Sequence, residues 1–210
     1  MTGVDADARS AVLDRIRAAL AAAPPAPVMV PRDYDRGPLR APGDVARFAE
    51  TVADYRARVV RITSAEIGAT VAALVPHGGV VAVPADLPEQ WVAEVATMRD
   101  GAAEELSTAS LETAAAVVTG CALGIAATGT IVLDGGETQG RRVLSLIPDH
   151  HICVVFAAQV VDTVSQGFAA LDPLRPLTFI SGPSATSDIE LERVEGVHGP
   201  RTLDVLIVTS

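Results

Sequence analysis

The stretch C-A-L-G-I-A-A-T-G-T-I-V-L-D-G-G, residues 121–136, decides the fold of this chain. Apolar segments of β character lie before it, at 116–119, and inside it, at 130–133. Glycine permits sharp turns and a close approach to a ligand because it lacks Cβ. We therefore predict two buried strands joined by a tight glycine loop that also cradles a ligand. The residues expected to form this cradle are Thr128, Gly129 and Thr130.

The same region raises the question of a membrane span, because residues 114–133 carry no charge. A transmembrane helix needs about 20 apolar residues. This segment, however, contains three glycines, three threonines and clusters of β-branched residues, and no basic residue lies next to either end. Buried strands explain it better, so we expect no membrane span.

Length and composition limit the classes of protein to consider. The chain has 210 residues, which suits one substantial domain with its own hydrophobic core. Its net charge of −10 argues against a nucleic-acid partner, since phosphate binding needs a basic surface. Residues 1–7 contain neither the basic nor the apolar part of a secretory signal. We therefore expect an acidic, cytoplasmic protein.

Two residue types constrain the chemistry. All 16 basic residues are arginine, so no lysine is available for a Schiff base, for pyridoxal phosphate or for a Walker-type phosphate loop. The two cysteines, Cys121 and Cys153, are isolated in apolar segments, so we expect them to be buried. They offer neither a disulfide framework nor a Cys-x-x-Cys metal site. We predict no metal site and no cofactor in this chain.

The apolar periodicity predicts an α/β fold with a mostly parallel sheet flanked by helices. A helical arm at 5–23 and a proline-rich linker at 24–42 precede the domain, which we place at 43–210. Further helices are expected at 44–59, 63–74, 88–99 and 160–171, and a short apolar turn at 143–147. Strands are expected at 59–62, 80–83, 116–119, 130–133, 152–156, 177–181 and 202–208.

A second candidate segment runs from residue 180 to residue 190, after an expected strand, and packs four hydroxyls into residues 181–187. We interpret it as a strand-to-helix turn whose N–H groups and hydroxyls bind an anion. Ligands sit at the carboxyl ends of strands in open α/β sheets. The alternative is an ordinary turn with a helix cap. The candidate residues are Ser181, Gly182, Ser184, Thr186 and Asp188.

Three histidines are candidates for proton transfer, each against a structural alternative. His150 and His151 are adjacent in an expected strand and should face opposite sides, so they cannot both bind one metal without a bend. His198 lies in a glycine turn, where it either bonds the backbone or forms a relay with Asp188 or Glu190. We select His151, His198 and Asp188. Two further carboxylates, Asp134 and Glu137, are interpreted as solvated loop charges in preference to site residues.

Four segments in a fixed order resemble the lactate utilisation protein C family, or LUD domain. They are residues 124–133, residues 144–148 with His151, residues 181–189 and residues 196–200. The resemblance covers about residues 45–210. Ala127 departs from it, because the family often has an acidic residue at this position.

The resemblance implies a fold like that of the sugar-phosphate isomerase, glucosamine-phosphate deaminase and coenzyme A transferase group. It also implies a role in oxidising L-lactate to pyruvate together with iron-sulfur partner proteins. Two cysteines are too few to hold an iron-sulfur cluster, so the redox centres would belong to those partners.

Three functions therefore remain open. The first is an accessory or substrate-binding subunit of a lactate-oxidising assembly, which binds a small hydroxy acid or another anionic small molecule. The second is a free-standing enzyme that acts on a sugar phosphate or an acyl-coenzyme A. The third is a non-catalytic scaffold whose N-terminal helix binds a partner. We rank the first ahead of the other two.

Overall fold

The computed structural model describes residues 4–22, 29–31, 43–101, 105–186, 194–195 and 199–209. Side chains are described for the same residues except 4–7, 22, 185–186 and 194–195. The chain divides into two units, residues 1–35 and 36–210. Each unit is described by itself.

The first unit contains the helix α1 (Val4–Ala22), which confirms the predicted N-terminal helix. Three apolar side chains recur along α1 at intervals of four residues and are at least half exposed: Val12, Ile16 and Leu20. No helix in the described part of the chain is long and apolar enough to cross a membrane.

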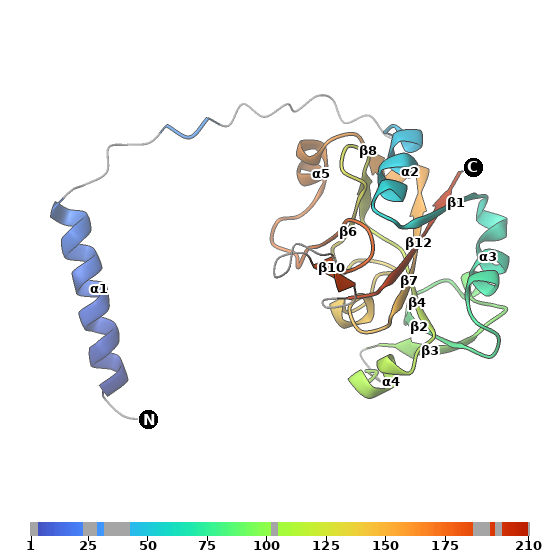
Figure 1. Ribbon diagram of the computed structural model, residues 1–210, viewed down its shortest axis with the longest axis horizontal. Coiled ribbons are helices and arrows are strands. Elements are labelled where there is room, and N and C mark those ends of the chain that lie inside the picture. Colours follow the sequence, from blue (N-terminus) through green and yellow to red (C-terminus); the bar gives the residue numbers. More distant parts are fainter. Residues whose placement is uncertain are drawn as a thin grey trace. The chain divides into compact units, whose positions relative to one another are not determined.

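The second unit is built on a six-stranded sheet in which every pair of neighbours is parallel (Figure 1). This architecture confirms the predicted α/β class with a mostly parallel sheet. In spatial order the strands are β1 (Arg58–Ile62), β12 (Thr202–Val208), β7 (His150–Phe156), β4 (Ala116–Thr119), β2 (Val80–Pro84) and β3 (Ala96–Asp100).

A second, four-stranded sheet was not predicted. Its strands pair antiparallel except β5 with β8, which run parallel. The order is β8 (Val160–Val161), β5 (Leu123–Ile125), β6 (Thr130–Leu133) and β9 (Thr178–Ile180). A separate two-stranded antiparallel sheet joins β10 (Ala185–Thr186) and β11 (Val194–Glu195).

Helices and short 3-10 helices connect these strands, and two predicted starts are confirmed. The Asp44 carboxylate accepts from the Arg47 N–H at the start of α2, and Thr63 and Glu66 form the predicted capping box. The helices are α2 (Val45–Asp54), α3 (Ile67–Leu74), α4 (Thr108–Glu112) and α5 (Val164–Ala170). The 3-10 helices are η1 (Ser64–Glu66), η2 (Glu89–Trp91), η3 (Arg142–Ser145) and η4 (Ala157–Gln159).

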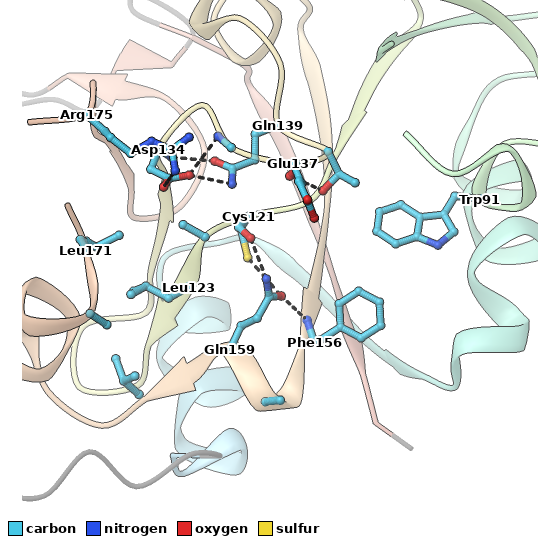
Figure 2. A pocket seen from close by; sticks show the side chains of 16 residues that line it. Trp91, Cys121, Leu123, Asp134, Glu137, Gln139, Phe156, Gln159, Leu171 and Arg175 are labelled. Atoms are coloured by element: carbon cyan, nitrogen blue, oxygen red, sulfur yellow. Dashed lines mark hydrogen bonds and ion pairs between the residues drawn. The ribbon is translucent and has the colours of Figure 1, made fainter. Parts of the chain in front are cut away.

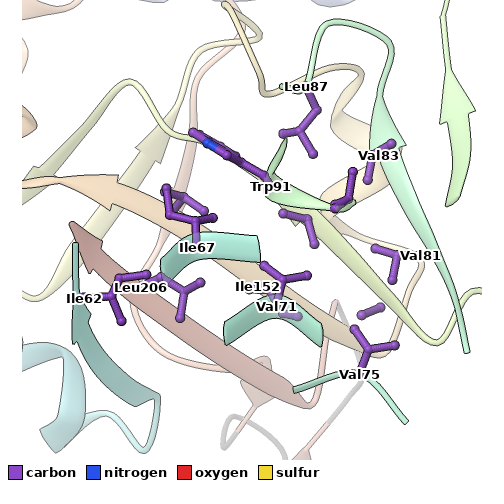
Figure 3. Packing of buried hydrophobic residues seen from close by; sticks show 14 of the residues in the cluster. Ile62, Ile67, Val71, Val75, Val81, Val83, Leu87, Trp91, Ile152 and Leu206 are labelled. Atoms are coloured by element: carbon purple, nitrogen blue, oxygen red, sulfur yellow. The ribbon is translucent and has the colours of Figure 1, made fainter. Parts of the chain in front are cut away.

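Aliphatic side chains fill both sides of the large sheet, as the low aromatic content requires. On one face, α3 and η2 cover Val81, Ile152 and Leu206, with Trp91 among them (Figure 3). The opposite face packs against α2 and the second sheet, and the residues buried there include Phe48, Val52, Ile131, Val155, Val205 and Ile207. The large sheet is therefore buried on both faces, which explains its nearly continuous apolar strands.

The predicted helix at 88–99 is wrong. Only η2 is helical there, and residues 96–100 form the strand β3, which pairs with the free edge of β2. The predicted helix at 160–171 is shortened for a similar reason. Val160 and Val161 are both buried as the strand β8, and α5 begins only after the Thr163 cap. In both places, strand pairing prevailed over an apolar spacing that also fits a helix.

The predicted pair of strands around the glycine loop is only partly right. Segments 116–119 and 130–133 are both strands, but they belong to different sheets. The strand that pairs with β6 is β5, which lies inside the quoted stretch and leads into the turn at residues 126–129. The predicted helix at 44–59 ends at Asp54, because Arg56 takes a positive φ of 68° before β1 begins.

Candidate functional site

A cavity of about 320 Å³ lies beside the amino ends of β7 and β12. We call it the serine pocket, because Ser145, Ser181 and Ser184 line it. The other residues that line it are Arg142, Leu146, His151, Thr178, Phe179, Ile180, Gly182, Pro183, Gly199, Pro200 and Leu203.

His151 is the buried imidazole of this pocket. It is the second residue of β7 and is 1% exposed, and its Nε2 lies 2.8 Å from Thr119 Oγ1 on the neighbouring strand β4. Burial, with a smaller effect from the nearby His150, lowers the pKa of His151 to about 4. The imidazole is therefore neutral at pH 7, which makes it a hydrogen-bonding group and a weak base.

The second ring nitrogen of His151 is not used by the bond to Thr119. Within the described part of the chain, Nδ1 has no hydrogen-bond partner, while every fully buried polar side-chain atom has one. Nδ1 therefore retains at least slight solvent contact, and His151 lines the serine pocket. A ligand in the pocket can bond to this nitrogen.

The glycine loop is connected to the serine pocket by a chain of hydrogen bonds that ends at Ser181. Thr128 Oγ1 lies 2.7 Å from Thr130 Oγ1, which in turn lies 2.8 Å from Ser181 Oγ. Of these three residues, only Ser181 lines the pocket. The loop thus orients Ser181 and does not itself form the cavity wall.

Gly129 has a packing role. Its φ is +59°, and a Cβ added there would lie 2.6 Å from the carbonyl carbon of Thr51 in α2. The glycine lets the turn approach the backbone of α2, where the Thr51 hydroxyl donates to the Ala126 carbonyl oxygen at 2.8 Å. The close contact that requires this glycine is therefore with α2.

The segment after β9 brings two more predicted residues to the pocket. Gly182 takes a φ of +79°, and an added Cβ would lie 2.5 Å from the Tyr55 carbonyl oxygen. The Ser184 N–H donates to the Pro200 carbonyl oxygen at 2.8 Å, which fixes this segment beside the one that precedes β12. Ser181, Gly182 and Ser184 therefore lie together with His151.

The remaining predictions for this segment have different outcomes. Residues 185–186 form β10, so the expected helix start is wrong at these two positions. Thr186 belongs to that strand, and its side chain lies outside the described residues, as do Asp188 and His198 in full. The segment follows the carboxyl end of a strand, as expected, but this strand is β9 of the second sheet, and the pocket lies beside the amino ends of β7 and β12 in the large sheet.

The sequence interpretation missed Arg142 and Ser145. Both belong to η3, Ser145 is buried, and Arg142 is exposed and lines the pocket. The guanidinium of Arg142 has no ion pair in the described part of the chain. None of the described residues that line the pocket is Asp or Glu. The described part of the lining therefore carries no negative side chain and one positive one, which suits a small anion.

Two other predicted features lie outside this pocket. His150 projects to the opposite face of β7, as predicted, and its Nε2 lies 2.5 Å from the buried carboxylate of Asp204. Arg58 also binds Asp204. Asp134 is buried, so its interpretation as a solvated loop charge is wrong. Among the described residues, no group of three or more His, Cys, Asp or Glu side chains is arranged to hold a metal.

The segments whose sequences carried the family resemblance meet at this site. Residues from 144–148, 181–189 and 196–200 line the serine pocket, and residues 124–133 reach it through the bond from Thr130 to Ser181. The LUD domain family model matches residues 45–208.

The chain belongs to the LUD domain family. A relative from Deinococcus radiodurans named "Lactate utilization protein C" is 43% identical to it, over 97% of this chain and 96% of that protein. Another protein of that name, from Geobacillus kaustophilus, is 30% identical over 71% of this chain and 72% of that protein. A crystal structure described as a DUF162 family protein from D. radiodurans superposes with a TM-score of 0.66. It is 40% identical and covers 79% of this chain and 96% of that chain.

Proposed function

We propose that this LUD domain is an accessory subunit of an assembly that oxidises L-lactate to pyruvate, and that its serine pocket binds a small hydroxy-acid or keto-acid anion. Relatives named "Lactate utilization protein C" support an involvement in lactate utilisation. The proposal of a small-anion ligand rests on the composition of the serine pocket. Its lining combines one arginine, three serines and a neutral imidazole, and none of its described residues is a carboxylate.

Each part of such a ligand has a matching group in the pocket. Arg142 offers a cation for the carboxylate, with the serine hydroxyls as further donors. His151 offers Nδ1 to the hydroxyl or keto oxygen. Because its pKa is about 4, His151 contributes more by binding than by removing a proton at pH 7. The cradle residues Thr128 and Thr130 act through Ser181, while Thr186, Asp188 and His198 remain proposed contacts.

Transfer of electrons from lactate would depend on other proteins. We propose that iron-sulfur partner proteins accept them, because two buried cysteines cannot provide the thiolates of a cluster in this chain. The chain itself would hold the small acid and bind those partners.

A thermal-shift screen tests the assignment of the ligand class. The purified chain is heated with L-lactate, pyruvate, coenzyme A, acetyl-coenzyme A or ribose 5-phosphate. A ligand at ~100 times its dissociation constant stabilises by about 2.7 kcal/mol, which raises Tm by roughly 5 to 10 °C in a domain of this size. We expect this rise with lactate or pyruvate. A rise with coenzyme A or the sugar phosphate alone would instead support the free-standing enzyme.

The scaffold remains a second candidate because of α1. Its exposed stripe of Val12, Ile16 and Leu20 is the kind of face by which an amphipathic helix binds a partner. Deletion of residues 1–42 tests it by co-purification with candidate iron-sulfur partner proteins. Loss of co-purification with an unchanged Tm would support a docking arm, and retained co-purification would exclude it.

A further inference from the structure

A second and larger cavity, of about 630 Å³, lies at the carboxyl ends of β4 and β7 (Figure 2). Cys121 and Ala122 follow β4, while Phe156 ends β7 and Gln159 follows it. The carboxyl edge is where parallel α/β sheets usually bind ligands, and the volume is in the range of small-molecule sites. We call this cavity the carboxyl-edge pocket. It shares no lining residue with the serine pocket.

One side of the carboxyl-edge pocket is aromatic and the other aliphatic. Trp91 and Phe156 lie at one side, with ring centroids 6.0 Å apart and ring planes tilted by 41°, and Leu123 and Leu171 lie at the other (Figure 2). Trp91 also belongs to the buried core, which holds its ring in place. Such walls favour a flat, apolar-faced ligand that can contact the rings.

A set of hydrogen bonds between the two sides is already complete. The Asp134 carboxylate accepts from Gln139 Nε2 at 2.9 Å and from the Gly136 N–H at 3.0 Å, and it pairs with Arg175 at 2.7 Å (Figure 2). The Asp134 N–H donates to Gln139 Oε1 at 2.6 Å. The charge of Arg175 is therefore neutralised by Asp134 before any ligand arrives.

Gln159 fixes the floor of the pocket. Its Nε2 donates to the Cys121 carbonyl oxygen at 2.7 Å, and its Oε1 accepts from the Phe156 N–H at 2.9 Å (Figure 2). This amide ties the end of β7 to the segment after β4. The pocket is thus held in shape by protein groups and does not depend on a ligand for its form.

Two polar groups of the lining remain uncommitted within the described part of the chain. The Glu137 carboxylate has neither a hydrogen bond nor an ion pair there, and Glu137 is exposed. The indole N–H of Trp91 has no described acceptor either, although Trp91 is only 6% exposed. Since every fully buried polar side-chain atom has a partner, this N–H must be reached by solvent. Of these two groups, the Glu137 carboxylate gives the pocket a free, negatively charged acceptor.

We propose that the carboxyl-edge pocket is a second ligand site, for an uncharged planar heteroaromatic ring that bears an amino group, as in an aminopurine nucleoside. The ring contacts Trp91 and Phe156, and the amino group donates to Glu137. A phosphate on the ligand weakens binding, because the uncompensated charge of the pocket is negative.

The chain reports occupancy of this pocket directly, because Trp91 is its only tryptophan. The first probe is adenosine, titrated while Trp91 emission is followed. Two matched probes test the amino group and the charge separately. Purine riboside lacks the amino group, and adenosine monophosphate adds a phosphate. We expect adenosine to change the emission saturably with a dissociation constant at or below ~1 mM. Purine riboside should bind at least about 5-fold more weakly, which corresponds to the loss of one modest hydrogen bond. The monophosphate should also bind more weakly than adenosine, because its phosphate is repelled by the Glu137 carboxylate.

Variants locate the effect in the pocket. Ala158→Phe places a ring at an exposed alanine of the lining and should abolish the change, while Ala65→Phe adds the same bulk to an exposed alanine outside it. Glu137→Gln should bring adenosine and its monophosphate closer in affinity. If Ala158→Phe proves unstable, Glu137→Gln still tests the proposal.

The proposal is overturned by any of three results. Adenosine produces no saturable change at millimolar concentration, the change persists in a folded Ala158→Phe variant, or the monophosphate binds as tightly as adenosine. Binding of L-lactate at the serine pocket is measured separately, so failure here leaves the proposed function standing.

Discussion

His150 and His151 are neighbours on β7 and face opposite sides of the large sheet. His150 meets the buried Asp204 carboxylate at 2.5 Å, and His151 meets the Thr119 hydroxyl at 2.8 Å. The strand geometry thus separates two imidazoles into unlike surroundings. One belongs to an ionic cluster at the amino ends of the strands, and the other belongs to the serine pocket. The two positions should therefore respond differently to substitution.

The low pKa of His151 predicts a loss of stability on mild acidification. The folded pKa is about 4, against about 6.5 in the unfolded chain, so unfolding takes up a proton between these values. The free energy of unfolding should therefore fall by up to about 3 kcal/mol as pH drops from 6.5 to 4. Urea unfolding at several pH values measures this fall. The His151→Gln variant lacks the titrating group and should lose correspondingly less.

The carboxylates overlap only the lower end of this pH window. Arg141 holds the pKa of Asp100 below its usual value, and Arg201 does so for Asp149, so the stability that these pairs contribute begins to fall only as pH approaches about 4. The same carboxylates are present in wild type and in His151→Gln, so the difference between the two proteins reports mainly on residue 151. Equal pH dependence of wild type and His151→Gln would show that His151 is not held neutral by burial.

The Asp204 cluster predicts an effect on stability. Burial raises the pKa of Asp204, but hydrogen bonds from Arg58 and His150 outweigh it and hold this pKa below the usual value. Asp204→Asn keeps the shape and removes the charge, so it should lower the free energy of unfolding by about 2 kcal/mol. Asp149→Asn, in an exposed pair with Arg201, is the matched control and should cost under about 1 kcal/mol. Similar losses from both would contradict the assignment.

Substitution of two glycines distinguishes the stability cost of backbone strain from the cost of a steric clash. Gly129 and Gly78 both take a positive φ, but an added Cβ meets the Thr51 backbone at 2.6 Å in the first case and nothing within 4 Å in the second. Gly78→Ala should cost about 1 kcal/mol through its φ alone. Gly129→Ala adds the clash and should cost about 2–4 kcal/mol. Urea unfolding of the two variants gives the comparison, and equal costs would show that α2 shifts away freely.

Local signals in the sequence were sufficient for much of the fold. The Asp44 cap and the box of Thr63 with Glu66 depend on neighbours within three residues, and both formed as predicted. Alternation of helix and strand predicted the parallel sheet. The second sheet was missed because β5 and β8 are only three and two residues long. Strands so short leave no readable period, and their partners are distant in sequence.

For the candidate site too, some residues could be predicted from the sequence and others depend on contacts between distant segments. Ser181, Gly182, Ser184 and His151 were selected from hydroxyl and imidazole content, and the structure brings them to one pocket. Arg142 was missed because an exposed arginine in a short turn carries no local signal of its own. The carboxyl-edge pocket was missed because its walls come from both sheets, and Asp134 is buried only through its contacts with Gln139 and Arg175.

Calorimetric titration of pyruvate into the wild-type chain and into Arg142→Gln tests the central claim most directly. Removal of the cation should weaken binding by about 10-fold to 100-fold, because a charge-assisted hydrogen bond contributes roughly 1.5–3 kcal/mol. Arg61→Gln removes an exposed arginine of β1 that does not line the serine pocket and should leave the affinity unchanged. Equal affinities of wild type and Arg142→Gln, or no binding by the wild type, would contradict a small-anion site in the serine pocket.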